Sequence, residues 1–132
     1  MIIKKLQKLN IFLIGILKKN LVYKLKISFS DEILGLISLI HFEQEERFEI
    51  KLLTVSKENR GKNKKYDGVA ENLIAFACRE AIKNHAENAC VSLFPKTELR
   101  SHYINKYGML EAGLHIFLEG VSLFKLLEKN EL

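Results

Sequence analysis

Glycines and lysines near the middle of the chain form a segment that could bind phosphate groups. Gly61 and Gly68 flank Lys62, Lys64 and Lys65. An apolar run precedes this segment and an amphipathic pattern follows it, an order typical of a strand, a loop and a helix. The first turn of a helix has N–H groups without partners in the helix and roughly half a positive charge. The segment therefore predicts a site for a pyrophosphate-bearing ligand, with a solvated basic loop as the alternative.

The helix that would supply these N–H groups has the clearest pattern in the sequence. Its apolar side chains recur at spacings of three and four residues, at Ala70, Leu73, Ile74, Ala77, Cys78, Ala81 and Ile82. Asp67 is expected to cap its N-terminus with the side-chain carboxylate. Buried strands are predicted before and after the helix, the second at residues 89–94. We therefore expect a βαβ unit with two parallel strands.

Three strands joined by short turns are predicted ahead of the loop, at residues 21–29, 33–42 and 48–55. Such strands form an antiparallel meander. Alternation in the third strand predicts one face with Phe48, Ile50 and Leu52, and another with Glu49, Lys51, Leu53 and Val55.

After the βαβ unit, a helix is predicted at residues 98–107, with Thr97 as its N-cap and Gly108 as its left-handed C-terminal residue. A strand or strand pair at residues 109–119 and a closing helix at residues 122–129 follow. The closing helix would turn Leu123, Leu126 and Leu127 inward. The predicted fold class is α+β: an antiparallel meander, a βαβ unit and a mixed sheet flanked by helices. Residues 1–132 are expected to form a single domain.

Charge is distributed unevenly along the chain. The net charge is +5, yet residues 1–29 hold seven lysines and no acidic residue, so the remainder carries a net charge of −2. A nearly neutral body argues against a nucleic-acid-binding surface. Two cysteines without a disulfide or zinc spacing indicate a reduced, cytoplasmic protein, and no metal site is expected.

The first 20 residues combine lysines with apolar residues at helical spacing. They predict a short N-terminal helix that packs on the domain. A helix lying on a membrane surface and a signal peptide are the alternatives, and we expect neither. The apolar run at residues 11–17 is too short to span a bilayer and lacks a cleavage site.

The order of these elements, with a basic glycine loop between the third strand and the main helix, resembles the GNAT superfamily of acyl-CoA-dependent N-acyltransferases. The resemblance covers roughly residues 21–127. The family signature is Arg/Gln-x-x-Gly-x-Gly/Ala, and residues 65–70 (KYDGVA) match it with lysine in the first position. Residues 55–62 also match the approach to this motif, which makes residues 63–67 an extra segment. The sequence YDGVAENLIAFAC…VSLFPKTELRSHYINKYG is similar to sequences of a subgroup of small bacterial GNAT-like proteins.

The resemblance implies that acetyl-CoA is the acyl donor and that no metal takes part. Its pantetheine arm would bind the strand end at Leu53, Thr54 and Val55. Its pyrophosphate would bind Arg60, Gly61, Lys62, Lys65, Tyr66, Asp67, Gly68, Val69 and Ala70. Gly68 and Ala70 are small enough to let the backbone approach a phosphate closely.

For the reaction, the resemblance implies transfer of an acetyl group to a primary amine. Tyr103 lies near the place of the family tyrosine that protonates the departing thiolate, with a packing role as the alternative. Glu49 and Glu58 are the candidate general bases, and each could equally be a surface carboxylate.

Two features depart from the family pattern: the extra segment, and the short region before residue 21, where relatives commonly add helices that shape the acceptor pocket. The acceptor site is then open, completed by a second copy in a homodimer, or missing. A non-catalytic CoA-binding or interaction domain is the alternative function.

Overall fold

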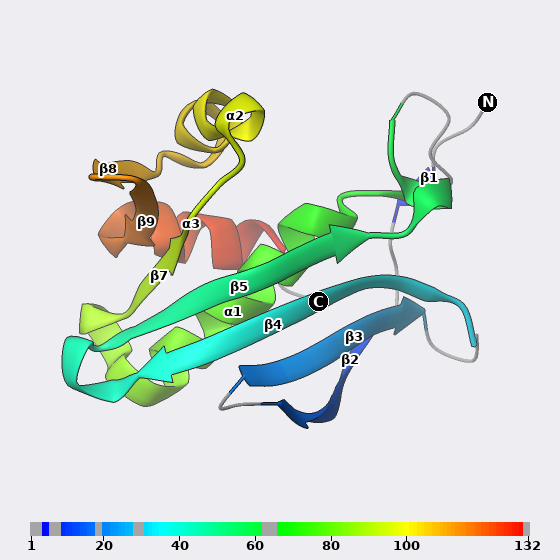
Figure 1. Ribbon diagram of the computed structural model, residues 1–132, viewed down its shortest axis with the longest axis horizontal. Helices are drawn as coiled ribbons and strands as arrows, with labels where there is room; N and C mark the ends of the chain where they lie inside the picture. The colour runs from blue at the N-terminus through cyan, green and yellow to red at the C-terminus, as the bar shows by residue number, and fades with distance from the viewer. Residues whose placement is uncertain (1–3, 6–8, 18–19, 28–30, 62–65, 131–132) are drawn as a thin grey trace.

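A mixed seven-stranded sheet forms the body of the protein in the computed structural model, which describes residues 4–5, 9–17, 20–27, 31–61 and 66–130. Its strand order is β2-β3-β4-β5-β7-β9-β8 (Figure 1). The bounds of these strands are Leu9–Leu17, Asn20–Ile27, Ile33–Phe42, Arg47–Val55, Cys90–Leu93, His115–Glu119 and Leu110–Ala112, in that order. The α+β fold class is confirmed.

The predicted meander is confirmed, and it is one strand longer than expected. β2, β3, β4 and β5 pair with one another in antiparallel fashion. The N-terminal helix predicted for residues 1–20 is therefore wrong: the described part of this segment forms β1 (Lys4–Lys5) and β2. β2 is a run of apolar and β-branched residues, which suits a strand once β3 offers a hydrogen-bonding edge. Helical spacing within so apolar a segment did not distinguish the two structures.

The βαβ unit is confirmed as β5, helix α1 (Val69–His85) and β7. Arg47–Ile50 pair in parallel with Cys90–Leu93. α1 packs on β4, β5 and β7, and its buried residues include Leu73, Ile74 and Ala77. This packing holds the start of α1 beside the end of β5.

A β-bulge in β5 changes the predicted alternation. Ile50 pairs with Leu39 and Leu52 pairs with Ser38, so Lys51 has no partner on β4. The prediction that Leu52 shares a face with Phe48 and Ile50 is wrong, since Leu52 is 46% exposed while the other two are buried. The extra residue reverses the faces, so Leu53 and Val55 pack against the core instead.

Two further helices follow β7. Helix α2 (Thr97–Tyr107) ends at Gly108, whose φ of 70° confirms the predicted left-handed C-terminal residue. The prediction of Thr97 as N-cap is wrong, because Lys96 occupies that position and Thr97 is the first helical residue. The strand pair β8 and β9 is confirmed. The closing helix is confirmed as α3 (Gly120–Lys129), with Leu123 and Leu126 buried.

The core lies between the sheet and the helices α1 and α3, which lie on one side of it (Figure 1). Phe48, Ile50 and Val91 point from the sheet into this core. Side chains alternate along a strand, so Glu49 and Ser92 point to the opposite face. Within the described ranges, no helix is long and apolar enough to cross a membrane.

Candidate functional site

β5 and β7 separate at the middle of the sheet. Ile50 and Leu93 form the last pair of their ladder, and β7 ends there while β5 continues to Val55 (Figure 1). Among the described residues, no strand therefore pairs with residues 51–55 on the side toward β7. Their outward N–H and C=O groups form a strand edge that an extended, amide-bearing ligand could pair with. Leu53, Thr54 and Val55, which the sequence assigned to pantetheine, lie on this edge.

A cavity of about 300 Å³ lies where this edge meets the start of α1. The β5–α1 connection and the first turn of α1 form one wall, and α2 forms the other. Its lining residues are Val55, Asn59, Arg60, Gly61, Asp67, Gly68, Val69, Ala70, Glu71, His102, Lys106 and Tyr107. The cavity thus brings together most of the residues predicted to bind pyrophosphate. Lys62 and Lys65 lie outside the described residues.

Some backbone N–H groups near the start of α1 already have partners, and others are open to a ligand. The Tyr66 N–H donates to Asn59 Oδ1 at 2.9 Å, and the Gly68 N–H donates to Asp67 Oδ1 at 3.0 Å. The prediction of Asp67 as N-cap is wrong, because Gly68 occupies that position and Asp67 accepts the Gly68 N–H, ahead of the first helical residue. The N–H groups of Val69 and Ala70 belong to the first helical turn, where no acceptor exists within the helix. They remain as donors for an anion.

Asn59 is a residue that sequence reasoning missed. It is 5% exposed, and its Nδ2 donates to Ser56 Oγ at 2.6 Å while its Oδ1 accepts from the Tyr66 N–H. Asn59 thus ties both ends of the loop together and shapes the cavity. Its position two residues before Gly61 in a polar loop gave the only sequence signal.

The cavity carries charges of both signs. Arg60 and Lys106 are exposed cations on its rim, and Asp67 and Glu71 are acidic. Glu71 forms an ion pair with Lys129 at 3.3 Å, so its charge is balanced from α3. Basic groups from α2, which the sequence had not assigned to the site, are therefore available to an anionic ligand.

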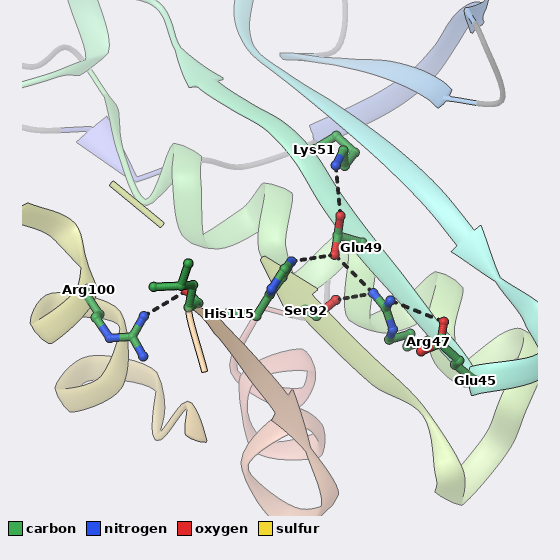
Figure 2. Close-up of polar contacts among 8 residues, drawn as sticks. Glu45, Arg47, Glu49, Lys51, Ser92, Arg100 and His115 are labelled. Carbon is green, nitrogen blue, oxygen red and sulfur yellow. Dashed lines mark hydrogen bonds and ion pairs between the residues drawn. The ribbon is translucent and has the colours of Figure 1, made fainter. Parts of the chain in front are cut away.

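Several polar side chains surround Glu49 on the face of the sheet opposite the core (Figure 2). Glu49 Oε1 accepts from Arg47 Nη1 at 3.1 Å and lies 3.0 Å from His115 Nε2, while Oε2 accepts from Lys51 at 3.1 Å. Arg47 Nη1 also donates to Ser92 Oγ at 2.8 Å. Three strands, β5, β7 and β9, thus contribute to one network around a carboxylate that is 5% exposed.

This network keeps Glu49 ionised. Burial of the carboxyl group raises its pKa, but the hydrogen bond and charge of Lys51, the hydrogen bond from Arg47 and the charge of His115 outweigh burial, and the pKa is lowered. A carboxylate held in this way is a weak base. Glu49 is therefore better suited to orient a neighbouring group than to remove a proton itself.

A smaller cavity of about 230 Å³ borders the network and is lined by Arg47, Cys90, Ser92, Ala112, His115 and Phe117. Burial, with the charge of Glu119, raises the pKa of the Cys90 thiol to about 11 despite the charge of Arg47. The thiol is therefore protonated at neutral pH and is a poor nucleophile. His115 is the second functional residue that the sequence did not indicate.

Tyr103 and Tyr107 stack on α2, with ring centroids 6.0 Å apart. Tyr103 is 9% exposed, and burial raises the pKa of its hydroxyl. Tyr107 lines the larger cavity, and burial together with the charges of Glu71, Tyr103 and Asp67 raises its pKa. Both hydroxyls are therefore protonated at neutral pH and can donate a proton.

Glu58, the other predicted base, lies apart from the Glu49 network. It is an exposed residue of the short 3₁₀-helix Lys57–Asn59 in the β5–α1 connection. Among the described residues, no group of three or more His, Cys, Asp or Glu side chains is placed to hold a metal ion.

Neither a family model nor a curated protein matches the sequence. Solved structures do match the fold. A Bacillus subtilis acetyltransferase in complex with CoA is 16% identical, with a TM-score of 0.57 over 78% of each chain. A putative streptothricin acetyltransferase from Bacillus anthracis in complex with acetyl coenzyme A is 18% identical, with a TM-score of 0.57 over 76% of this chain and 63% of that one. A Staphylococcus aureus acetyltransferase of the GNAT family is 12% identical, with a TM-score of 0.54 over 75% and 66%. The chain has the fold of the GNAT-family acetyltransferases.

Proposed function

We propose that this protein is an N-acetyltransferase that moves an acetyl group from acetyl-CoA to a primary amine. The observation that carries the proposal is the juxtaposition of the open β5 edge with the cavity at the start of α1. The two features suit the two chemically different parts of CoA. The structural neighbours solved in complex with CoA or acetyl-CoA support the same ligand class.

The donor would bind in two segments. Its pyrophosphate accepts hydrogen bonds from the N–H groups of Val69 and Ala70, in the positive field of the α1 N-terminus. Arg60, Gly61 and Lys106 surround it, and Lys62 and Lys65 are proposed to add charge. The pantetheine amides then pair with the backbone of residues 53–55, which places the thioester toward Lys51, where β5 and β7 separate.

The chemistry needs a neutral amine and a stabilised leaving group. The amine nitrogen attacks the thioester carbonyl carbon, the C–S bond breaks, and the sulfur takes up a proton. Tyr103 is proposed as the donor of that proton, since its hydroxyl stays protonated at neutral pH. Glu58 remains a candidate base through water, although its exposed position away from the Glu49 network favours it less.

The acceptor is proposed to be a small-molecule or peptide amine that approaches the face carrying Glu49. In the described part of the chain, every α-helix follows β5, so none is inserted among the meander strands. This arrangement supports the prediction of an open acceptor side, and a homodimer that completes it also remains a prediction. A cytoplasmic location, a bacterial source and the absence of nucleic-acid and membrane partners also remain predictions.

Calorimetric titration with acetyl-CoA tests the binding half of the proposal, and thiol release from acetyl-CoA with a panel of primary amines tests the chemical half. Binding together with amine-dependent thiol release is the expected result. Binding without thiol release for any amine supports the alternative, a non-catalytic CoA-binding domain. Absence of any heat or thermal shift with millimolar acetyl-CoA overturns both.

A further inference from the structure

The Glu49 carboxylate fixes one tautomer of His115. His115 Nε2 lies 3.0 Å from Glu49 Oε1, and an ionised carboxylate can only accept a hydrogen bond. Nε2 must therefore carry a proton, which leaves the lone pair of a neutral imidazole on Nδ1. Within the described part of the chain, no hydrogen bond to Nδ1 is formed. His115 thus presents a basic nitrogen in a defined orientation (Figure 2).

This imidazole stands where β5 and β7 separate. β9 runs antiparallel to β7 and Ile116 pairs with Leu93, so His115 lies beside Phe94, the first residue past the ladder. The rings of Phe94 and His115 meet edge to face with centroids 5.5 Å apart. The His115 side chain is 43% exposed and also lines the 230 Å³ cavity. His115 therefore borders both that cavity and the point where β5 and β7 separate, at which the thioester is proposed to lie.

The other polar groups here are less suited to remove a proton. Glu49 is already bonded to Arg47, Lys51 and His115. Ser92 Oγ accepts from Arg47. Arg47 is a permanent cation, and the Cys90 thiol is protonated. Among the described residues that line the cavity, His115 is the one whose side chain presents a nitrogen lone pair outside this hydrogen-bond network.

We propose that His115 is the general base of the acetyl transfer and that Glu49 is its positioning residue. This assignment rests on the proposed N-acetyltransferase function. His115 Nδ1 takes a proton from the acceptor ammonium, and the neutral nitrogen attacks the thioester carbonyl carbon to form the C–N bond of a tetrahedral adduct, whose C–S bond then breaks. The second nitrogen proton leaves as the tetrahedral adduct collapses, and one proton ends on the CoA sulfur. The net products are the amide, CoA thiol and one proton.

Bromoacetyl-CoA tests this placement without knowledge of the acceptor. It carries an electrophilic carbon next to the thioester carbonyl, and a free imidazole nitrogen displaces bromide from that carbon. After incubation, tandem mass spectrometry of the digested protein locates the adduct. We expect one adduct on His115, blocked by excess CoA, and its loss in His115→Gln. The control His41→Gln, on the core face of β4 against Phe48, should keep the adduct.

Glu49 is tested by nitrogen-15 NMR of the histidine rings at pH 8 on folded protein. The native protein should show protonated Nε2 and unprotonated Nδ1 for His115. Alkylation of His115 by bromoacetyl-CoA should slow at least tenfold in Glu49→Leu. If Glu49→Leu does not fold, Glu49→Gln is used and the same slowing is expected. The role of His115 alone is overturned by the opposite tautomer or by an adduct on Lys51 or Cys90. It is also overturned if no adduct forms in protein that still binds CoA. Failure to bind CoA in the calorimetric titration overturns this role and the acetyltransferase function together.

Discussion

Ile50 of β5 and Leu93 of β7 are the last paired residues of the parallel ladder, and the two strands diverge beyond them. Next to this point, Lys51 forms a bulge toward β4 and His115 lies beside Phe94. One local separation of strands therefore creates both the free edge for the donor and the opening toward the acceptor. The proposed chemistry depends on this relationship.

Cations at the larger cavity should strengthen donor binding. Arg60→Ala and Lys106→Ala should each weaken acetyl-CoA binding by about fivefold, since an exposed charge on a phosphate contributes roughly 1 kcal/mol. The measurement is calorimetric titration at low and high salt, with a smaller loss at high salt because ions screen the contact. Lys83→Ala is the matched control, because Lys83 pairs with Glu80 outside the cavity. Equal losses in all three variants would contradict a specific phosphate site.

Gly35 should tolerate no larger side chain. A Cβ at this position would lie 2.7 Å from the Thr54 carbonyl oxygen and 2.9 Å from Leu73 Cδ1. Gly35→Ala should therefore reduce the free energy of unfolding by about 1–3 kcal/mol through overpacking between β4, β5 and α1. Chemical denaturation measures this change. Gly15→Ala in β2 is the control, since nothing lies within 4 Å of its Cβ, and a larger loss there than at Gly35 would contradict the packing described.

Loss of the Glu49 charge should destabilise the protein in a pH-dependent way. The lowered pKa means that the ionised carboxylate stabilises the fold above its ordinary pKa, and that this stabilisation is lost as the pH falls through the folded value. Glu49→Gln should cost about 1–3 kcal/mol at pH 7, because Arg47 and Lys51 lose their charged acceptor. Denaturation at pH 7 and at about pH 3 should show the difference between native protein and variant shrinking. A difference that is constant with pH would show that Glu49 is not ionised in the network.

Tyr103 should matter for the rate and little for the fold. Tyr103→Phe keeps the ring in the core and removes only the hydroxyl, so the melting temperature should change little while kcat falls by roughly 100-fold. Thiol-release kinetics, with the amine found in the acceptor screen, measure the rate. Tyr107→Phe is the comparison: it should affect acetyl-CoA binding at the larger cavity and leave kcat at saturation unchanged. A normal kcat for Tyr103→Phe would assign this tyrosine to packing.

Local sequence patterns predicted much of this fold correctly, and the reason differs from element to element. α1 was predicted because its apolar residues follow helical spacing between two apolar strands. The ends of α2 and of the β5–α1 loop were found because Gly108 and Gly68 take positive φ angles that other residues rarely adopt. In contrast, the helix predicted over β2 is wrong, because its apolar residues also fit helical spacing and only pairing with the next strand, β3, makes the segment a strand.

For the candidate site, the sequence predicted the loop and the start of α1 from local patterns, and it named Glu49 only as one of two candidate bases. It did not identify His115, Arg47 and Ser92 as neighbours of Glu49, because they are brought together only when β5, β7 and β9 pair. It also did not indicate the bulge at Lys51, which depends on the register with β4. Strand and helix patterns are local, whereas a buried carboxylate and its partners depend on contacts between distant segments. That is why the loop–helix unit could be predicted from the sequence, while the chemical environment of Glu49 required the folded sheet.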